Sequence, residues 1–535
     1  MDRVWSAPSI PAGALASAEE FGSGTAVVDG ACTLTFTEVA DEMVTVAAAL
    51  VASGVEPGDR VGVWAPNSAS WITAALGVLA SGAWLVPVNT RFKAAETAFV
   101  LAKVDASHLF VCDGFLDGHQ LDELRAEAPQ LRALRDPILL PMPGEVDRPE
   151  WRAFRDRADA ATRDEARARI AAIGPDAVSD VIFTSGTTGM PKGVMLRHGA
   201  SLRIYRVYSQ LMKLSAGDRG LIVLPFFHTF GYKAGWMADL LTGATTYPLA
   251  VFDGASLMEA IDRHKITFFP GTPTMFWPML DDPRRHDYDL SSLNKSVVAA
   301  TFLPVELVHR LREEVGIDFL STGYGLTEAH SLVSKCLVGD SDETVATTVG
   351  KVLDGVEVKI VDDDGNEVPP RAEGEILVRG IGLMSGYYGD PAATAAAYLD
   401  GWLRTGDIGS IDEHQYVRIT DRKKDIYITG GFNVAPTEVE NTLISFDGVG
   451  QIAVVGVPDH RLGEVGAAFI APISGQTVDP DAVVAYARER MANFKVPRYV
   501  WIVDALPLNA TGKVLKDALR ARHRELADER TEGNR

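Results

Sequence analysis

Residues 181–195, with the sequence VIFTSGTTGMPKGVM, constrain the fold of this chain more than any other stretch. The stretch opens with the apolar residues Val181, Ile182 and Phe183, which is typical of the end of a buried strand. A loop of Ser, Thr and Gly follows, whose small side chains let backbone N–H groups close on an anion. Lys192 adds a cation after the loop. The stretch therefore predicts a strand that runs into a phosphate-binding loop.

The loop differs from a Walker A motif, which has a second Gly directly before its Lys and a Ser or Thr directly after it. Here Pro191 precedes Lys192 and Gly193 follows it. A flexible Gly/Ser surface loop is the remaining alternative, and the preceding strand and the Lys favour phosphate binding over it. The residues predicted to bind the phosphates, besides Lys192, are Thr184, Ser185, Gly186, Thr187, Thr188 and Gly189.

Size and charge exclude several classes of protein. With 535 residues the chain exceeds a single core and predicts at least two domains. The net charge of −21 repels a phosphate backbone, so nucleic acid and anionic membranes are poor partners. Cys32, Cys112 and Cys336 are isolated and the first residues lack the apolar core of a signal peptide, which favours the cytoplasm.

The first hundred residues alternate helical patterns with apolar runs such as residues 60–64 and 84–88. Strands without polar alternation are typical of a parallel sheet that helices cover on both faces. Residues 71–88 are apolar almost to the length of a membrane span. Asn67 and Ser68 precede them as caps, Gly82 interrupts them and Pro87 ends them, so we expect a buried helix followed by a buried strand.

The phosphate-binding stretch resembles that of the adenylate-forming superfamily, which comprises acyl-CoA synthetases, luciferases and peptide-synthetase adenylation domains. Residues 320–328, LSTGYGLTE, resemble the second signature of the same superfamily. The resemblance implies that Tyr324 stacks on adenine and that Gly325 lies beside the nucleotide. It further implies that the Thr327 hydroxyl binds the α-phosphate and that Glu328 is an oxygen ligand of magnesium.

Residues 225–237, PFFHTFGYKAGWM, place aromatic side chains around one His and one Lys just after an expected strand at residues 220–224. Aromatic clusters are more often core than pocket. The resemblance places His228 between the nucleotide and the acyl pocket, as a catalytic or gating contact for the carboxylate. Lys233 has two open interpretations: its stem covers apolar surface, or its ammonium meets a polar group of the acid. The residues predicted for the acyl pocket are His228, Phe230, Lys233, Ala299, Phe302 and Gly323.

Four later stretches resemble the remaining signatures of the superfamily. Asp407 in WLRTGD would accept hydrogen bonds from the ribose, and Arg422 in ITDRKKDI would contact the ribose or a phosphate. Gly430 and Gly431 would let the pantetheine arm of coenzyme A pass close to the backbone. Lys513, after Thr-Gly near the end of the chain, occupies the position of the adenylation lysine.

The resemblance covers about residues 25–520 and implies an α/β fold. It consists of a large N-terminal domain of doubly wound α/β subdomains with a β subdomain, and a small mobile α+β C-terminal domain. The implied bounds are residues 1–421 for the first domain and 427–535 for the lid domain, with a hinge at 422–426 whose pivot is Lys424. A β hairpin is expected near residues 357–362 and 374–379, and a helix is expected to start at Asp479-Pro480.

The predicted function is that of an ATP-dependent acid:CoA ligase with ATP, Mg²⁺ and coenzyme A as cofactors. Alternatives are an adenylating enzyme that loads a carrier protein in trans, a luciferase-like oxygenase, and a non-catalytic protein that keeps the fold. The chemistry joins two anions, so the site must supply positive charge and N–H donors. Glu328, Asp407, Arg422 and Lys513 are all present, which argues against the non-catalytic alternative.

The substrate is a small carboxylic acid, and several further strings narrow its class. FFHTFGYKAG, RITDRKKD and VPDHRLGEVGAAF are similar to the acyl-CoA ligases of bacterial sterol breakdown that activate a propanoate on a bicyclic indanedione. This similarity predicts a bulky ring-bearing acid, with a medium-chain fatty acid or an aryl acid as alternatives. The sequence does not settle the oligomeric state, for which a homodimer is one option.

Overall fold

The computed structural model describes residues 2–127, 131, 133–184, 191–299, 303–422, 425–429, 432–459, 461–509 and 513–532. The chain divides into two compact units. The first comprises residues 1–357 and 378–403, and the second comprises residues 358–377 and 404–535. Each unit has its own apolar core, and the sheets and helices confirm the predicted mixed α/β fold with a large N-terminal and a small C-terminal part.

The largest sheet of the first unit carries the phosphate-binding stretch at one side. Its strands, in spatial order, are β18 (Gly386–Tyr387), β8 (Lys192–Arg197), β7 (Val178–Thr184), β4 (Trp84–Pro87), β3 (Arg60–Trp64), β5 (His108–Val111) and β6 (Ile138–Leu139). The strands from β7 to β6 run parallel, whereas β8 is antiparallel to both β7 and β18. The apolar runs at residues 60–64 and 84–88 are thus buried parallel strands, as predicted.

The long apolar run contains the helix α4 (Ala69–Ala80) followed by β4, as predicted. The Ser68 hydroxyl caps the helix by accepting a hydrogen bond from the Trp71 N–H at 3.1 Å. All residues of α4 are buried, and α3 (Phe36–Ala52) packs against it so closely that a Cβ on Gly77 would lie 2.2 Å from the Val46 side chain. Among the described residues no helix is both long and apolar enough to cross a membrane.

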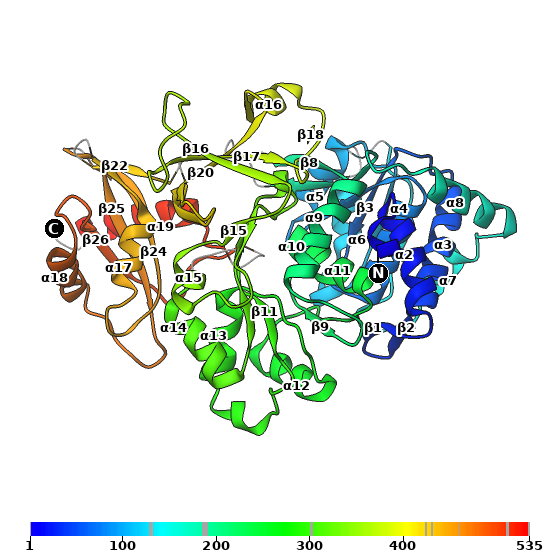
Figure 1. The fold of residues 1–535 in the computed structure, drawn as a ribbon, viewed down its shortest axis with the longest axis horizontal. Helices are drawn as coiled ribbons and strands as arrows, with labels where there is room; N and C mark the ends of the chain where they lie inside the picture. The colour runs from blue at the N-terminus through cyan, green and yellow to red at the C-terminus, as the bar shows by residue number, and fades with distance from the viewer. Residues whose placement is uncertain are drawn as a thin grey trace. The chain divides into compact units, whose positions relative to one another are not determined.

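A second sheet of the first unit has the order β2 (Cys32–Thr35), β1 (Thr25–Asp29), β10 (Thr245–Pro248) and β9 (Arg219–Ile222). The parallel pair β11 (Lys295–Val297) and β12 (Phe319–Ser321) continues it through single bridges at Phe268. The helices α12 (Gly254–His264), α13 (Pro273–Asp281) and α14 (Val305–Arg310) lie together in the green part of the ribbon beside β11 (Figure 1). Their apolar side chains form a second core with β9 and β12.

The other helices of the first unit are short to medium in length. They are α1 (Asp2–Trp5), α2 (Ile10–Phe21), α5 (Ala94–Lys103), η1 (Phe115–Asp117), α6 (Gln120–Ala126), α7 (Pro149–Arg155), α8 (Ala160–Ala172), α9 (His198–Leu211), α10 (Thr229–Gly231), η3 (Tyr232–Met237), α11 (Ala238–Thr242), η4 (Pro283–Asp287), η5 (Leu311–Val315), η6 (Thr327–Ala329), α15 (Asp342–Thr347) and α16 (Pro391–Ala396). A three-stranded sheet of β13 (Gly323–Tyr324), β14 (Ser334–Lys335) and β15 (Lys351–Val352) carries the second signature.

The boundary between the two units passes through three strands, β16 (Val356–Val361), β17 (Gly374–Gly380) and β20 (Trp402–Ile411). These belong to one sheet of order β16-β17-β20-β19, in which β19 spans Tyr398–Leu399 and β21 (Val417–Arg422) pairs with β20. The strands β16 and β17 occupy the positions of the predicted hairpin. The compact units therefore divide the chain earlier than the predicted bounds of 1–421 and 427–535, which stay a prediction.

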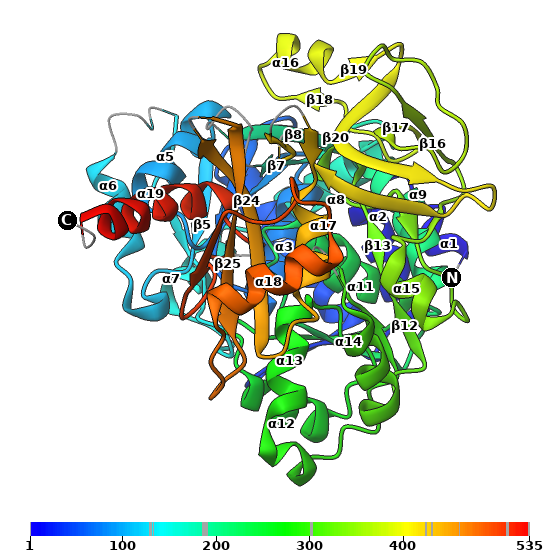
Figure 2. The same cartoon turned by 90° about the vertical axis from the view of Figure 1, so that its left-hand side faces the viewer.

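The second unit contains a five-stranded sheet in which β26 (Tyr499–Ile502) pairs with β25 (Gly463–Pro472). The remaining order is β23 (Phe432–Val434), β22 (Tyr427–Thr429), β25 and β24 (Val449–Asp459). Three helices, α17 (Pro436–Leu443), α18 (Pro480–Arg490) and α19 (Lys516–Glu532), lie around it (Figure 1 and Figure 2). Asp479 caps α18 directly before Pro480, so the predicted start of this helix is confirmed.

Candidate active site

The two ends of the phosphate-binding loop are held together by the antiparallel pair β7 and β8. Thr184, the last residue of β7, lies opposite Lys192, the first residue of β8, and both side chains are partly exposed. Because β7 leads up to Thr184 and β8 continues from Lys192, these two residues are held at paired ends of the two strands. The predicted donors between them, Ser185, Gly186, Thr187, Thr188 and Gly189, lie outside the described residues.

The second signature forms a tight turn after β13. Tyr324 and Thr327 are buried, with 8% and 6% of their surfaces exposed, and Glu328 is partly exposed. A Cβ on Gly325 would lie 2.0 Å from the backbone carbon of Ser331, so no other residue fits this close approach of two backbone segments. The Ser331 N–H donates to the Leu326 carbonyl at 2.8 Å and closes the turn. The turn thus fixes Thr327 and Glu328 relative to β13.

Tyr387 connects the two signatures, and the sequence patterns did not predict it. Its hydroxyl donates a hydrogen bond to Oε1 of Glu328 at 2.9 Å, and its ring lies 5.0 Å from the Lys192 ammonium. Because β18 pairs antiparallel with β8, Tyr387 lies opposite Val194, two residues after Lys192. Burial, together with the Glu328 carboxylate, raises the pKa of Tyr387, so the phenol stays a neutral donor. One side chain therefore contacts both the predicted phosphate cation and the predicted magnesium ligand.

His228 precedes the short helix α10 and lies partly buried. Its Nδ1 accepts a hydrogen bond from the Phe230 N–H at 3.3 Å, which leaves the proton of the neutral ring on Nε2. Burial lowers the pKa of His228 to about 4, so the ring is uncharged near pH 7. The side chain is thus a neutral N–H donor, which suits contact with a carboxylate oxygen.

The aromatic residues around His228 divide between core and rim. Trp71, Phe226, Tyr232 and Trp236 are fully buried, or nearly so, and their rings pack against one another at centroid distances between 5.0 and 6.4 Å. They form part of the core of the first unit. Phe230 is partly exposed, which leaves its prediction as an acyl-pocket residue open.

Lys233 is fully buried in the core of the first unit. Its ammonium lies 3.0 Å from Oδ2 of Asp180 and 2.7 Å from Oγ of Ser201. The interpretation in which only the stem of Lys233 covers apolar surface and the ammonium stays in water is therefore wrong. Burial lowers the pKa of Lys233, and the Asp180 carboxylate opposes this shift. The contact of Lys233 with the acid stays a prediction.

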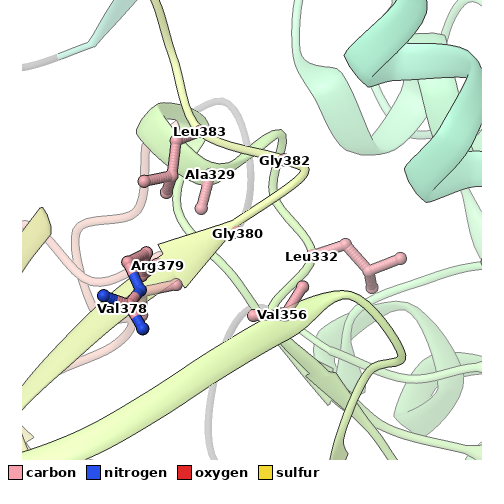
Figure 3. Close-up of a pocket in the computed structure, with 8 residues that line it drawn as sticks. All are labelled: Ala329, Leu332, Val356, Val378, Arg379, Gly380, Gly382 and Leu383. Carbon is pink, nitrogen blue, oxygen red and sulfur yellow. The ribbon is translucent and has the colours of Figure 1, made fainter. Parts of the chain in front are cut away.

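Of the other predicted acyl-pocket residues, two are described. Ala299 follows β11, is partly buried and donates its N–H to the Gly271 carbonyl at 3.1 Å. Gly323 begins β13 and is partly exposed. Phe302 lies outside the described residues. Figure 3 shows a shallow hollow next to the second signature, lined mainly by apolar groups. Its one charged residue, Arg379, pairs with Glu357 at 2.6 Å and offers no reacting group.

The second unit carries the later signatures. Asp407 on β20 is buried, with 4% of its surface exposed, and lies opposite Arg422 on β21. Lys513 is partly exposed. Its N–H donates to Oδ1 of Asn509 at 2.9 Å, and the Asn509 N–H donates to the Lys513 carbonyl at 2.8 Å. Lys424, Gly430 and Gly431 lie outside the described residues, as does the side chain of Arg422.

Glu328 is the predicted magnesium ligand among the described residues. Within the described part of the chain no group of three or more His, Cys, Asp or Glu side chains is arranged to hold a metal ion. Magnesium is commonly held by one or two carboxylates together with substrate phosphates and water. A single partly exposed carboxylate, oriented by Tyr387 next to Lys192, fits this type of site.

Comparison with protein families gives two matches in chain order. The AMP-binding enzyme model matches residues 15–388, and the AMP-binding enzyme C-terminal domain model matches residues 438–513. The chain belongs to the AMP-binding enzyme family. It is an AMP-forming ligase by class, and the predictions of ATP, Mg²⁺ and coenzyme A as the cofactors of this family are confirmed.

The similarity of this AMP-binding enzyme to known proteins covers nearly its whole chain. A 3-(7a-methyl-1,5-dioxo-octahydro-1H-inden-4-yl)propanoyl:CoA ligase from Rhodococcus jostii is 47% identical over 511 residues, covering 94% of this chain and 96% of the relative. A ligase of the same name from Mycobacterium tuberculosis is 47% identical over 91% of this chain and 93% of the relative. The anthranilate CoA ligase AuaEII with anthranoyl-AMP gives a TM-score of 0.84 at 26% identity, covering 96% and 97% of the two chains.

Proposed function

We propose that this AMP-binding enzyme is an ATP-dependent acid:CoA ligase that acts on a propanoate side chain attached to a bulky bicyclic diketone. The observation that carries this proposal is the 47% identity to an indanedione propanoyl:CoA ligase over 94% of this chain and 96% of the relative. Because acyl pockets are built from residues outside the common signatures, similarity of this extent bears on the substrate more than the signatures do.

The proposed reaction has two steps. In the first, a carboxylate oxygen attacks the α-phosphorus of ATP, the bond to the β-phosphate oxygen breaks, and acyl-AMP and pyrophosphate form. In the second, the sulfur of coenzyme A attacks the acyl carbon, the bond to the AMP oxygen breaks, and the thiol proton passes to water. No side chain of the enzyme needs to act as a nucleophile, because coenzyme A supplies the attacking sulfur.

For the first step, three cationic or N–H donors of this chain are proposed to bring two anions together. Lys192 would bind the triphosphate with the loop that it closes. His228 would donate from Nε2 to the acid carboxylate, and the neutral ring supported by its low pKa suits this role. Lys513 would place its ammonium on the reacting oxygens. Donors and cations held in place where negative charge develops account for most of the rate enhancement in many such reactions.

The nucleotide would be bound by residues of several of the signatures. Tyr324 and Gly325 would hold the adenine, Thr327 would donate to the α-phosphate, and Asp407 would accept from the ribose, with Arg422 beside it. Glu328 would hold Mg²⁺, which when bound neutralises charge on the phosphates. Tyr387 supports this proposal because its hydrogen bond restrains the carboxylate.

The second step is proposed to need a different position of the small domain. Residues 422–426, with Lys424 as the pivot, would turn this domain so that Lys513 leaves and Gly430 and Gly431 border the pantetheine arm. Enzymes commonly use domain rotations of this kind to separate two half-reactions. Loading of a carrier protein in trans would use the same first step and is the alternative for the second.

The test is a panel of acids with purified enzyme, ATP, Mg²⁺ and coenzyme A. Pyrophosphate release is expected to depend on the acid, and AMP release is expected to require coenzyme A as well. The indanedione propanoate should be preferred over octanoate and over an aryl acid such as ferulate in kcat/KM. A higher kcat/KM for plain alkanoates than for every ring-bearing acid would overturn the substrate assignment and leave the ligase class intact.

Localisation and assembly complete the proposal. We place the enzyme in the cytoplasm, which is supported by three buried cysteines that are all free thiols. A homodimer stays a prediction, and sedimentation equilibrium of the purified enzyme at two concentrations would distinguish it from a monomer.

A further inference from the structure

Lys335, the second residue of β14, is a buried cation with no polar partner among the described residues. Its side chain is 1% exposed, and within the same part of the chain its Nζ has neither a hydrogen bond nor an ion pair. The ammonium lies 5.3 Å from the centroid of the ring of Tyr208 on α9. Leaving a charged donor buried without an acceptor is costly, so a position of this kind needs an explanation.

The side chain of Tyr208, whose ring centroid lies 5.3 Å from the Lys335 ammonium, carries a second donor. The hydroxyl of Tyr208 is buried and, like Nζ of Lys335, has no hydrogen bond among the described residues. The neighbouring thiol of Cys336 is already in contact with Thr348, at 3.7 Å from Oγ1. The hydroxyl of Tyr205 already donates to the His330 carbonyl at 2.7 Å. Neither of these two groups offers a free acceptor to the Lys335 ammonium, whereas Oδ1 of Asp239, a carboxyl group that acts electrostatically on Tyr208, is buried without a hydrogen bond among the described residues.

Lys335 lies directly opposite Gly323, the predicted acyl-pocket residue that begins β13. In the antiparallel pair β13 and β14, Gly323 pairs with Lys335. Side chains of paired residues leave a sheet on the same face, and Gly323 has none, so no side chain from this paired position covers Lys335. Tyr324 follows Gly323 directly, and Thr327 and Glu328 follow in the turn. A donor at Lys335 thus borders the strand that leads into the nucleotide site.

We propose that Lys335 determines the substrate specificity of the acyl pocket by donating a hydrogen bond to a ketone oxygen on the ring end of the acid. This inference rests on the proposed function. A ketone oxygen accepts hydrogen bonds and donates none, which matches the buried Lys335 ammonium, a donor without a partner among the described residues. The carboxyl end of the same acid would lie at His228, so Lys335 would contact the opposite end.

The proposed hydrogen bond has a consequence for discrimination between acids. A site built to hydrogen-bond a substrate rejects an analogue that lacks the matching group, because its own donor is then left buried and unpaired. An acid of the same shape with methylene groups in place of the ketones should therefore bind poorly. Burial lowers the pKa of Lys335 to about 7, and the amine donates a hydrogen bond in both of its protonation states.

The experiment compares two acids that differ only in the ring ketones, the 1,5-dioxo-octahydroindenyl propanoate and its 1,5-dideoxo analogue. Each is assayed by acid-dependent pyrophosphate release with the full-length enzyme, Lys335→Met, Lys335→Gln and the control Lys351→Met. Met has a similar volume to Lys and no donor, whereas Gln keeps an N–H donor. Lys351 lies opposite Lys335 on β15 and is exposed, so its replacement changes the charge of the same sheet without changing the buried donor.

The wild type is expected to prefer the diketone over the dideoxo acid in kcat/KM. Lys335→Met should reduce this ratio by about 10- to 100-fold, mainly through KM of the diketone and with a gain for the dideoxo acid. Lys335→Gln should retain part of the ratio, and Lys351→Met all of it. The two monoketone acids would then identify which oxygen is bound.

The outcomes separate the inference from the proposed function. If the wild type uses neither ring acid, the proposed substrate class fails. If the wild type prefers the diketone and both Lys335 variants keep the full ratio, the function stands and the inference is overturned. A Lys335→Met variant that lowers kcat for both acids equally would also contradict it, because a purely structural role predicts that pattern. Should Lys335→Met not fold, the Gln variant and the monoketone series decide in the same way.

Discussion

At the scale of single residues, Tyr387 is the side chain on which the geometry of the phosphate end most depends. It donates to the Glu328 carboxylate at 2.9 Å, and its ring lies 5.0 Å from the Lys192 ammonium. A hydrogen bond from an outer group fixes the orientation of a metal-binding carboxylate and tunes its affinity. The hydroxyl and the ring of Tyr387 therefore have separable effects, the first on Glu328 and the second on Lys192.

Tyr387→Phe removes the hydroxyl and keeps the ring. We expect the concentration of Mg²⁺ that gives half-maximal pyrophosphate release to rise by about 10- to 100-fold, because the Glu328 carboxylate loses its donor. The matched control is Tyr388→Phe, since the Tyr388 hydroxyl contacts the Val104 carbonyl at 3.4 Å and not Glu328. An equal response of the two variants to Mg²⁺ would show that the Tyr387 hydroxyl has no part in the metal site.

Lys335 also makes a prediction about stability in the absence of substrate. Burial lowers its pKa from 10.5 to about 7 in the folded enzyme, so the fold favours the neutral amine. The unfolded chain binds more protons between about pH 7 and 10.5, and stability from this group rises with pH across that window. Below pH 7 the full cost of burying the charge is present.

Lys335→Met should therefore raise the melting temperature of the unliganded enzyme at pH 6 to 7, and this gain should shrink towards pH 10. Cys336, whose pKa burial raises to about 11, and Tyr208, whose pKa burial also raises, stay largely neutral over most of this range and do not mask the trend. Thermal unfolding of both proteins at matched pH values measures the gain. A gain that is constant with pH would mean that Lys335 is not a buried titrating amine.

Sequence reasoning identified residues that belong to fixed motifs and missed those defined by pairing. His228 was predicted from its place after a strand, and its neutral ring depends on burial and on the Phe230 N–H, which no pattern reveals. Tyr387 was missed because its role arises from the pairing of β18 with β8, almost two hundred residues apart. The Gly-Tyr-Tyr run before Asp390-Pro391 was the one available signal.

At the scale of elements, the ion pair of Asp180 and Lys233 joins the strand before the predicted phosphate-binding loop to the helix that follows His228. Asp180 lies on β7, which leads into the phosphate-binding loop, and Lys233 lies on η3, shortly after His228. Ser201 on α9 adds a third element, 2.7 Å from the ammonium. Both members of the pair are fully buried, so breaking it leaves a charge without compensation.

Lys233→Met should destabilise the enzyme by about 3–5 kcal/mol, because Asp180 is left as an unpaired buried carboxylate. Adding Asp180→Asn should recover much of this loss, which a double-mutant cycle in urea measures. The KM for the acid should change little in variants that remain folded. A stable Lys233→Met variant with a strongly raised KM for the acid would instead place Lys233 in contact with the substrate.

The elements themselves were largely predictable where one physical signal dominated. Residues 60–64 form a strand with the predicted bounds, because a continuous apolar run with no polar alternation fits only a strand buried on both faces. The expected strand at residues 220–224 ends at Ile222 instead, and beyond it the Asn67 side-chain amide donates to the carbonyls of Val223 and Leu224. A hydrogen bond from a side chain more than 150 residues away leaves no trace in the local sequence pattern.

At the scale of the whole molecule, the proposed mechanism assigns roles to residues in both compact units. The first unit contains Lys192, His228, Tyr324 and Glu328, and the second contains Asp407 and Lys513. Each unit folds around its own core, which is compatible with a small domain that turns as a body. The predicted hinge at 422–426 and its pivot are untested, and the sequence could name them only through resemblance.

The most direct test is to measure the two half-reactions separately in Lys513→Ala. Formation of acyl-AMP from acid and ATP should fall by roughly 10²- to 10³-fold, because the variant lacks one donor to developing charge. Conversion of supplied acyl-AMP and coenzyme A to the thioester should stay near the wild-type rate, because Lys513 is proposed to have left the site by then. An unaltered rate of acyl-AMP formation would contradict the account at its centre.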